Sequence, residues 1–192
     1  DTTGIIDSIT GKFIENYLNN GTGGAIHNKG QIDYISADFI GNKNNKGGAI
    51  QNVGGTITLI EDSNFIANRA SDYAGAVRNE SAGKVTIKDS FFKDNYGKSR
   101  GGAVYTAGAN SETTITGSTF DGNYTREYGG AISNGKITNI SNSTFTNNIS
   151  VYGGGATFTG DGGSYYITDT NFSGNLAGTF GGAVHNDQGR NV

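Results

Sequence analysis

The chain has 192 residues, of which 33 are glycine, and it contains no Pro, Cys, Met or Trp. Without cysteine it has neither a disulfide scaffold nor a thiolate for metal binding or nucleophilic catalysis. Its net charge of −3 gives no general attraction for a nucleic-acid backbone, and no apolar run approaches the length of a membrane-spanning helix. We therefore expect a segment with no membrane span and no nucleic-acid partner.

Two short motifs alternate along the chain. The first is Phe-x-x-Asn, with its phenylalanines at Phe13, Phe39, Phe65, Phe92, Phe120, Phe145 and Phe172. Its closing asparagines are Asn16, Asn42, Asn68, Asn95, Asn123, Asn148 and Asn175. The second is Gly-Gly-Ala-Ile/Val, which begins at Gly23, Gly47, Gly101, Gly129 and Gly181 and has variants at 74–77 and 154–157. Successive phenylalanines are 25 to 28 residues apart, so one pair of motifs forms one repeat.

A β-branched stretch fills the rest of most repeats, as at 56–60, 84–87, 113–116, 136–138 and 166–168. Three short β segments per repeat, with Gly/Asn/Asp turns between them, predict a right-handed parallel β-helix of about seven coils of 24–28 residues. We expect residues 1–192 to be a single β-helix segment, a fragment of a longer repeat protein. Open strand edges at its ends would permit end-to-end self-association.

Equivalent positions of successive coils stack in columns in such a fold. The phenylalanines are expected to form an aromatic ladder in the core, and the asparagines a hydrogen-bonded ladder in which each Asn occupies a left-handed bend. Strand alternation predicts that the Ile or Val of the glycine motif points inward and its Ala outward. A second asparagine column follows the glycine motif, with interruptions at Thr106 and Thr159.

Seven in-phase pairs of Gly-Gly-Ala-Ile/Val and Phe-x-x-Asn resemble the repeats of chlamydial polymorphic membrane proteins and related autotransporter passenger domains. The resemblance covers essentially the whole chain. It implies a right-handed β-helical passenger on the bacterial cell surface or outer membrane, or secreted, that acts as an adhesin. The partner it implies is a host-cell or other surface receptor, either a protein or a glycan.

Few residues suggest catalysis. Asp62 and Asp89 lie three residues before their phenylalanines on adjacent coils, which would place them about 5 Å apart on the outer surface. We interpret them as a solvated acidic stripe, with a Ca²⁺ site or a glycosidase dyad as weaker alternatives. His27 and His185 share a column of varied residues that is expected to face outward, and they are too far apart to share a metal ion. The sequence predicts a non-enzymatic protein without a cofactor.

The most suggestive surface feature is an aromatic and cationic stripe just before the glycine pairs. It comprises Lys46, Tyr73, Arg100, Tyr128, Tyr152 and Phe180. Such a stripe could stack on sugars or anchor a protein partner, and its rings could equally cover the neighbouring turns. We predict adhesion through the lateral surface. The alternatives are a structural spacer stalk of a large surface or secreted protein and a polysaccharide-active enzyme.

A looser row of outward threonines is expected at Thr58, Thr116, Thr138 and Thr168. Regular threonine arrays occur in β-helical antifreeze proteins. Ice binding is therefore a minor further alternative, weakened by the lysine at position 88, which interrupts the row.

Overall fold

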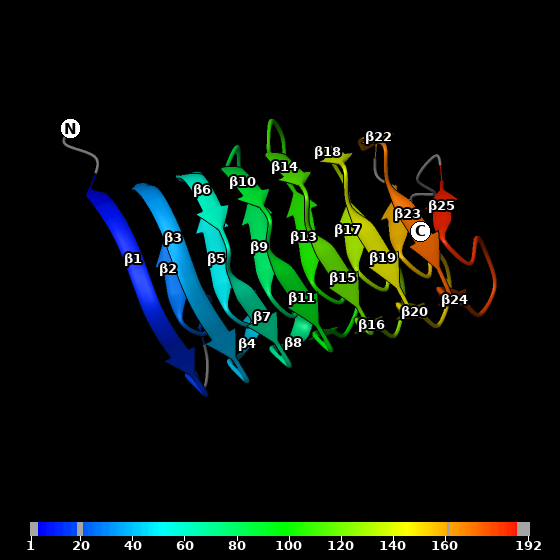
Figure 1. Cartoon of the computed structure of the whole chain (residues 1–192), viewed down its shortest axis with the longest axis horizontal. Helices are drawn as coiled ribbons and strands as arrows, with labels where there is room; N and C mark the ends of the chain where they lie inside the picture. The colour runs from blue at the N-terminus through cyan, green and yellow to red at the C-terminus, as the bar shows by residue number, and fades with distance from the viewer. Residues whose placement is uncertain (1–3, 19–20, 161, 188–192) are drawn as a thin grey trace.

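The computed structural model describes residues 4–18, 21–160 and 162–187. These residues form parallel β-strands and contain no helix, hence none that could cross a membrane. The chain winds into about seven coils stacked along one axis, with the first coil at one end and the last at the other (Figure 1). The predicted parallel β-helix is confirmed.

The largest sheet has twelve strands. They are β1 (Ile5–Ile14), β3 (Gln31–Ile40), β6 (Thr56–Glu61), β7 (Asn64–Ile66), β10 (Lys84–Lys88), β11 (Phe91–Lys93), β14 (Glu112–Thr116), β15 (Thr119–Asp121), β18 (Ile137–Ser141), β19 (Thr144–Thr146), β22 (Ser164–Thr168) and β23 (Asn171–Ser173). Each of the first two coils contributes one long strand to this sheet, whereas each later coil contributes two shorter strands. A residue with positive φ separates the two, such as Asp62 or Asp89.

Two further sheets complete each coil. The six-stranded sheet comprises β4 (Lys43–Lys46), β8 (Arg69–Tyr73), β12 (Tyr96–Gly97), β16 (Tyr124–Thr125), β20 (Ile149–Ser150) and β24 (Leu176–Ala177). The seven-stranded sheet comprises β2 (Ile26–Asn28), β5 (Ile50–Val53), β9 (Val77–Glu80), β13 (Val104–Ala107), β17 (Ile132–Asn134), β21 (Thr157–Thr159) and β25 (Val184–Asn186). All strand pairs in the described part of the chain are parallel and join successive coils, so their hydrogen bonds run along the axis.

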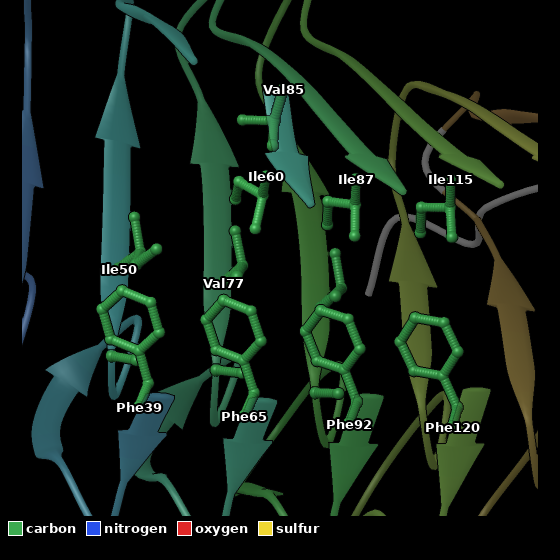
Figure 2. Close-up of a cluster of buried hydrophobic side chains, with 14 of the residues drawn as sticks. Phe39, Ile50, Ile60, Phe65, Val77, Val85, Ile87, Phe92, Ile115 and Phe120 are labelled. Atoms are coloured by element: carbon green, nitrogen blue, oxygen red, sulfur yellow. The ribbon is translucent and has the colours of Figure 1, made fainter. Parts of the chain in front are cut away.

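The phenylalanine ladder forms the core as predicted. Neighbouring ring centroids are 4.6 to 5.0 Å apart, and the ring planes lie within 11° of each other. The five rings from Phe39 to Phe145 are completely buried. Figure 2 shows four of them in one column, with the branched side chains of Ile50 and Val77 packed beside them. This continuous stack takes the place of a globular core.

The first asparagine ladder is also confirmed. The Oδ1 of Asn95 accepts hydrogen bonds from the backbone N–H and the Nδ2 of Asn68, both at 3.0 Å, and its own Nδ2 donates to the carbonyl of Phe65 at 2.8 Å. The expected left-handed bend at each Asn is wrong. Positive φ falls on the preceding residue, as at Ala67 and Asp94, because the Asn uses both its N–H and its side chain along the stack.

The second asparagine column is hydrogen-bonded in its first coils. The Nδ2 of Asn28 donates to Asn52 at 2.8 Å, and that of Asn52 donates to Asn79 at 3.0 Å. In the next coil Thr106 interrupts the column, and the Nδ2 of Asn79 instead reaches the hydroxyl of Thr113 at 3.1 Å. The predicted interruption at Thr106 is therefore confirmed.

The prediction that the alanines of the glycine motif point outward is wrong. Fully buried in the core are Ala49, Ala76, Ala103, Ala131 and Ala156. The N–H groups of Ala49 and Ile50 both donate to the carbonyl of Ala76, at 3.1 and 2.9 Å. Because the backbone bends between these two residues, strand alternation does not apply there, and both side chains reach the core.

The expected threonine row is not continuous. Thr138 is completely buried and pairs with the equally buried Thr113, so it points inward. Thr116 and Thr168 instead belong to the register position of Ser141. The threonines therefore occupy different columns, and the regular array that ice binding would need is absent at these positions.

Candidate binding surface

The predicted stripe lies where each coil leaves the six-stranded sheet. Bridges between successive coils join the column Lys46, Tyr73, Arg100, Tyr128, Gly153 and Phe180. Tyr152 is therefore one residue outside the column. Its coil carries three consecutive glycines at 153–155, and Gly153 takes the stripe position. The ring of Tyr152 still lies beside the stripe, with its centroid 5.8 Å from that of Tyr128.

The next column toward the C-terminus of each coil is on the outer face of the seven-stranded sheet. We expected it to be exposed, but its central members are buried, at 8% exposure or less: Gln51, Arg78, Tyr105, Ser133 and Phe158. Only His27 is exposed and His185 half-buried, at the two ends of the column. The expectation of an exposed face is wrong because the stripe side chains fold over this column.

One cluster centres on Arg78. Its guanidinium lies 4.9 Å from the ring centroid of Tyr73 and 5.6 Å from that of Tyr105, and these two rings stack at 5.2 Å. The same guanidinium donates to the carboxylate of Glu80 at 2.6 Å, and that carboxylate also accepts from Gln51. Arg78 is only 7% exposed, so this cluster acts as a small core outside the main one.

A second cluster occupies the last coils. The ring of Phe158 lies 4.5 Å from Tyr128 and 5.2 Å from His185, and the guanidinium of Arg100 sits 5.7 Å above it. Stripe residues in both clusters are thus half-buried against their own protein. The more exposed stripe candidates are Tyr152 at 50% and Phe180 at 56%. A binding role for the whole stripe stays a prediction.

No sequence-based expectation covered a second row, which we call the outer row. It comprises the residue after each ladder asparagine: Tyr17, Lys43, Arg69, Tyr96, Tyr124, Ile149 and Leu176. These residues pair in register along the outer face of the six-stranded sheet. The signal was present in the sequence, because the asparagine before each of them points inward and strand alternation then sends the next side chain outward.

The two central rings of the outer row, Tyr96 and Tyr124, present their edges to solvent. Tyr96 and Tyr124 stack face to face at 5.7 Å with an interplanar angle of 18°, and the guanidinium of Arg69 covers the other face of Tyr96 at 5.7 Å. A shallow depression of about 250 Å³ opens between Tyr17 and Tyr96. Tyr17, Lys43, Asn45, Arg69, Ser71 and Tyr96 contribute to its walls.

Charge is unevenly distributed on this face. The four strand segments 43–46, 69–73, 96–100 and 124–128 contain six Lys and Arg but only two Asp and Glu, although acidic residues outnumber basic ones in the whole chain, 17 to 14. We call this region the basic face; its cations are Lys43, Lys46, Arg69, Lys98, Arg100 and Arg126. A locally positive surface is thus displayed on an acidic protein.

The last two coils of the same sheet carry no charged residue in segments 149–153 and 176–180. They expose large apolar side chains at 39% to 59%, which we call the apolar patch: Ile149, Val151, Tyr152, Leu176 and Phe180. Ile149 pairs with Leu176, and Gly153 beside Tyr152 pairs with Phe180, so the patch is continuous across the two coils. Contiguous exposed apolar surface commonly marks an interaction site.

The candidate carboxylates lie elsewhere. Asp62 and Asp89 are exposed residues with φ of 48° and 45°, at the turn that splits the twelve-stranded sheet. Asp and Asn tolerate this left-handed conformation, which accounts for their presence there. Lys88 contacts Asp89 at 3.3 Å and Glu61 at 2.5 Å, and these carboxylates raise the pKa of Lys88. Among the described residues, no three His, Asp or Glu side chains are grouped to hold a metal ion.

Two stretches of the chain match a known family of repeats. The family model for the Chlamydia polymorphic membrane protein repeat matches residues 117–135 and 169–187. No curated protein and no solved structure matches the chain. Each matched stretch contains one Phe-x-x-Asn and one Gly-Gly-Ala-Ile/Val in that order. These two segments therefore carry the chlamydial polymorphic membrane protein repeat, which confirms the resemblance found in the sequence.

Proposed function

We propose that this β-helix is a surface-exposed repeat segment of a bacterial protein, located at the outer membrane or secreted, and that it acts in adhesion without catalysing a reaction. The observation that carries the proposal is the apolar patch on the side of the rod. Large apolar side chains on two adjacent coils are exposed, although burying them would be favourable, and three of them, Ile149, Val151 and Tyr152, lie on a coil that has another coil on either side. A receptor, protein or glycan, that covers them would supply that burial.

The matched repeat supports the location. The family named in the match is one of membrane proteins, and a rigid lateral surface suits contact with another cell. The described residues bring no nucleophile, base and basic side chain together in a pocket, and Asp62 and Asp89 stand on an open turn. A spacer stalk is the second candidate, favoured by ladders that run through every coil and stiffen the rod.

The test uses the purified, fluorescently labelled segment on epithelial cells and on matrix proteins. The patch variant Tyr152→Ser/Leu176→Ser/Phe180→Ser removes three exposed apolar side chains. The control Ile137→Ser/Tyr166→Ser removes exposed apolar side chains from the twelve-stranded sheet instead. Saturable binding that is lost in the patch variant and kept in the control supports adhesion at this site.

Failure of the well-folded segment to bind any surface would overturn adhesion and favour the spacer. The stripe is tested separately by Tyr73→Ser/Tyr128→Ser. Because Tyr73 contacts Arg78 and Tyr128 contacts Phe158, this variant also loosens the outer clusters, and its unfolding temperature must be compared with that of the parent. Unchanged cell binding by a folded stripe variant would exclude the stripe from the adhesive surface.

A further inference from the structure

We propose that the basic face binds a linear anionic polysaccharide lying along the solenoid axis. The inference rests on the proposed adhesive function and names the chemical class of one of its partners. The basic face covers the four coils N-terminal to the apolar patch. Three of its features support the proposal: its positive charge, the spacing of its hydrogen-bond donors and the stacking of its aromatic rings on neighbouring side chains.

The positive charge of the basic face is uncompensated. Lys43, Arg69, Lys98 and Arg126 are exposed, and within the described part of the chain none of them forms an ion pair. Lys43 and Arg69 are direct neighbours in register, and the backbone N–H of Arg126 donates to the carbonyl of Lys98 on the adjacent coil. Like charges on adjacent strands repel each other, so this arrangement costs stability unless an anion lies between them.

The spacing of the outer row matches that of a sugar chain. Outer-row side chains repeat at the strand separation of ~4.8 Å, which is close to the length of one pyranose ring. The depression between Tyr17 and Tyr96 adds the amide of Asn45 and the hydroxyl of Ser71, which already bond to each other at 2.7 Å. A sugar unit in this depression would meet cations for its carboxylate or sulfate and polar groups for its hydroxyls. Successive sugars would meet successive coils.

The arrangement of the aromatic rings favours a glycan over other polyanions. Single-stranded nucleic acids bind by stacking bases on exposed aromatic faces. Here one face of Tyr96 is covered by Arg69 and the other by Tyr124, so the rings present their edges and hydroxyls instead. An acidic peptide that adds a strand needs a free sheet edge, whereas the backbone groups of this sheet bond to the coils on either side. Edge-on hydroxyls and cations suit a polyhydroxylated anion.

The experiment measures binding of the folded segment to four immobilised polymers: heparin, polygalacturonate, neutral dextran and single-stranded polyuridylate. We expect binding to heparin or polygalacturonate, and the two differ in their sulfate and carboxylate groups. Binding should weaken with added salt, because exposed charge pairs are screened. Dextran should not bind. Stronger binding to polyuridylate than to both acidic glycans would overturn the inference in favour of a nucleic-acid surface.

Matched variants locate the site. Lys43→Ser/Arg69→Ser should weaken glycan binding about tenfold, since it removes two cations whose exposed ion pairs with the glycan are individually weak. Lys84→Ser/Lys93→Ser makes the same change in net charge at exposed lysines on the twelve-stranded sheet and should have little effect. Lys43→Arg/Arg69→Lys keeps the charge and should retain binding. Equal losses in the two serine variants would show a nonspecific effect of net charge and overturn the inference.

The same variants are tested on cells, so the two proposals can fail separately. Cell binding without binding to either acidic glycan leaves adhesion standing and overturns the anionic partner. Glycan binding that depends on Lys43 and Arg69, without attachment to any cell, supports the glycan site and removes adhesion as its purpose. Circular dichroism of each variant confirms that the β-helix is intact before binding is compared.

Discussion

The asparagine ladder provides the sharpest test of how this fold is held together. Asn95 is completely buried, and its side chain takes part in four hydrogen bonds. Oδ1 accepts two of them from Asn68, and Nδ2 donates the other two, to Asn123 at 3.0 Å and to the carbonyl of Phe65. We predict that Asn95→Ala destabilises the protein far more than the same change at the exposed end of the ladder.

The magnitude follows from what each partner loses. The backbone N–H of Asn68 loses the Oδ1 of Asn95 as its acceptor, and an orphaned buried donor costs about 1–3 kcal/mol. The Nδ2 of Asn68 keeps its bond to Phe39, and Asn123 keeps the backbone N–H of Asn95, so these losses are partial. Together they give about 3–4 kcal/mol. Asn16→Ala should cost less than about 1 kcal/mol, because Asn16 is exposed and the Oδ1 of Asn42, which loses the side-chain donor, keeps the backbone N–H of residue 16.

Urea unfolding followed by circular dichroism measures both variants, with hydrogen exchange as a local readout. Exchange at the N–H of Asn68 should accelerate in Asn95→Ala and remain slow in Asn16→Ala. The local readout matters because a repeat protein can lose two-state behaviour. Free energies for the two variants within about 0.5 kcal/mol of each other, with unchanged exchange at Asn68, would refute the ladder as a source of stability.

Three further changes probe the packing. Phe92→Ala should lower the free energy of unfolding in urea by about 3–5 kcal/mol, because it removes a ring stacked at 4.6 Å on both sides. The neighbouring Phe91 is only half-buried, so Phe91→Ala should cost about 1 kcal/mol. Equal costs for the two variants would contradict the ladder. Gly102→Ala would place a Cβ 1.9 Å from a backbone carbonyl of the next coil and should cost about 3 kcal/mol or more, while Gly4→Ala, with open space around it, should leave the melting temperature unchanged. Ala67→Gly should stabilise the protein by about 0.5–1 kcal/mol. Ala67 has a φ of 53°, a left-handed backbone conformation that glycine adopts without strain. A lower melting temperature in this variant would contradict the prediction.

Residues that repeat in phase were predictable from the sequence. An identical Phe or Asn in every repeat can form a ladder only if equivalent positions stack, and that requirement led directly to a coiled parallel fold. The direction of Ala49 was not predictable in this way. Alternation assumes an extended backbone, whereas Ala49 and Ile50 share one carbonyl acceptor and are bent relative to each other.

Burial outside the main core was harder to predict. The column containing Arg78, Tyr105 and Phe158 varies from coil to coil, which is typical of exposed positions, yet all three are buried beneath stripe side chains. Variation is possible there because the two clusters are built differently. In one the buried column supplies the cation, Arg78, beside Tyr73 of the stripe, and in the other it supplies the ring of Phe158, beneath Arg100 and Tyr128 of the stripe. The burial of this column cannot be inferred from its own residues, because it depends on contacts with the side chains of the stripe.

Binding surfaces can change along this rod while the fold does not, because the ladders constrain only the inward-facing positions. A ladder residue such as Asn95 contacts the identical residue in the coil before it and in the coil after it. A substitution there therefore affects both neighbouring coils. An outer-row residue such as Lys43 or Leu176 only lies beside its neighbours, and its identity is set by no ladder. Within one scaffold the row passes from cations and tyrosines in the early coils to aliphatic side chains in the last two. Arg69→Leu should therefore weaken binding in the heparin assay, because it removes a cation from the basic face. In urea unfolding the same variant should change the free energy of unfolding by less than about 1 kcal/mol.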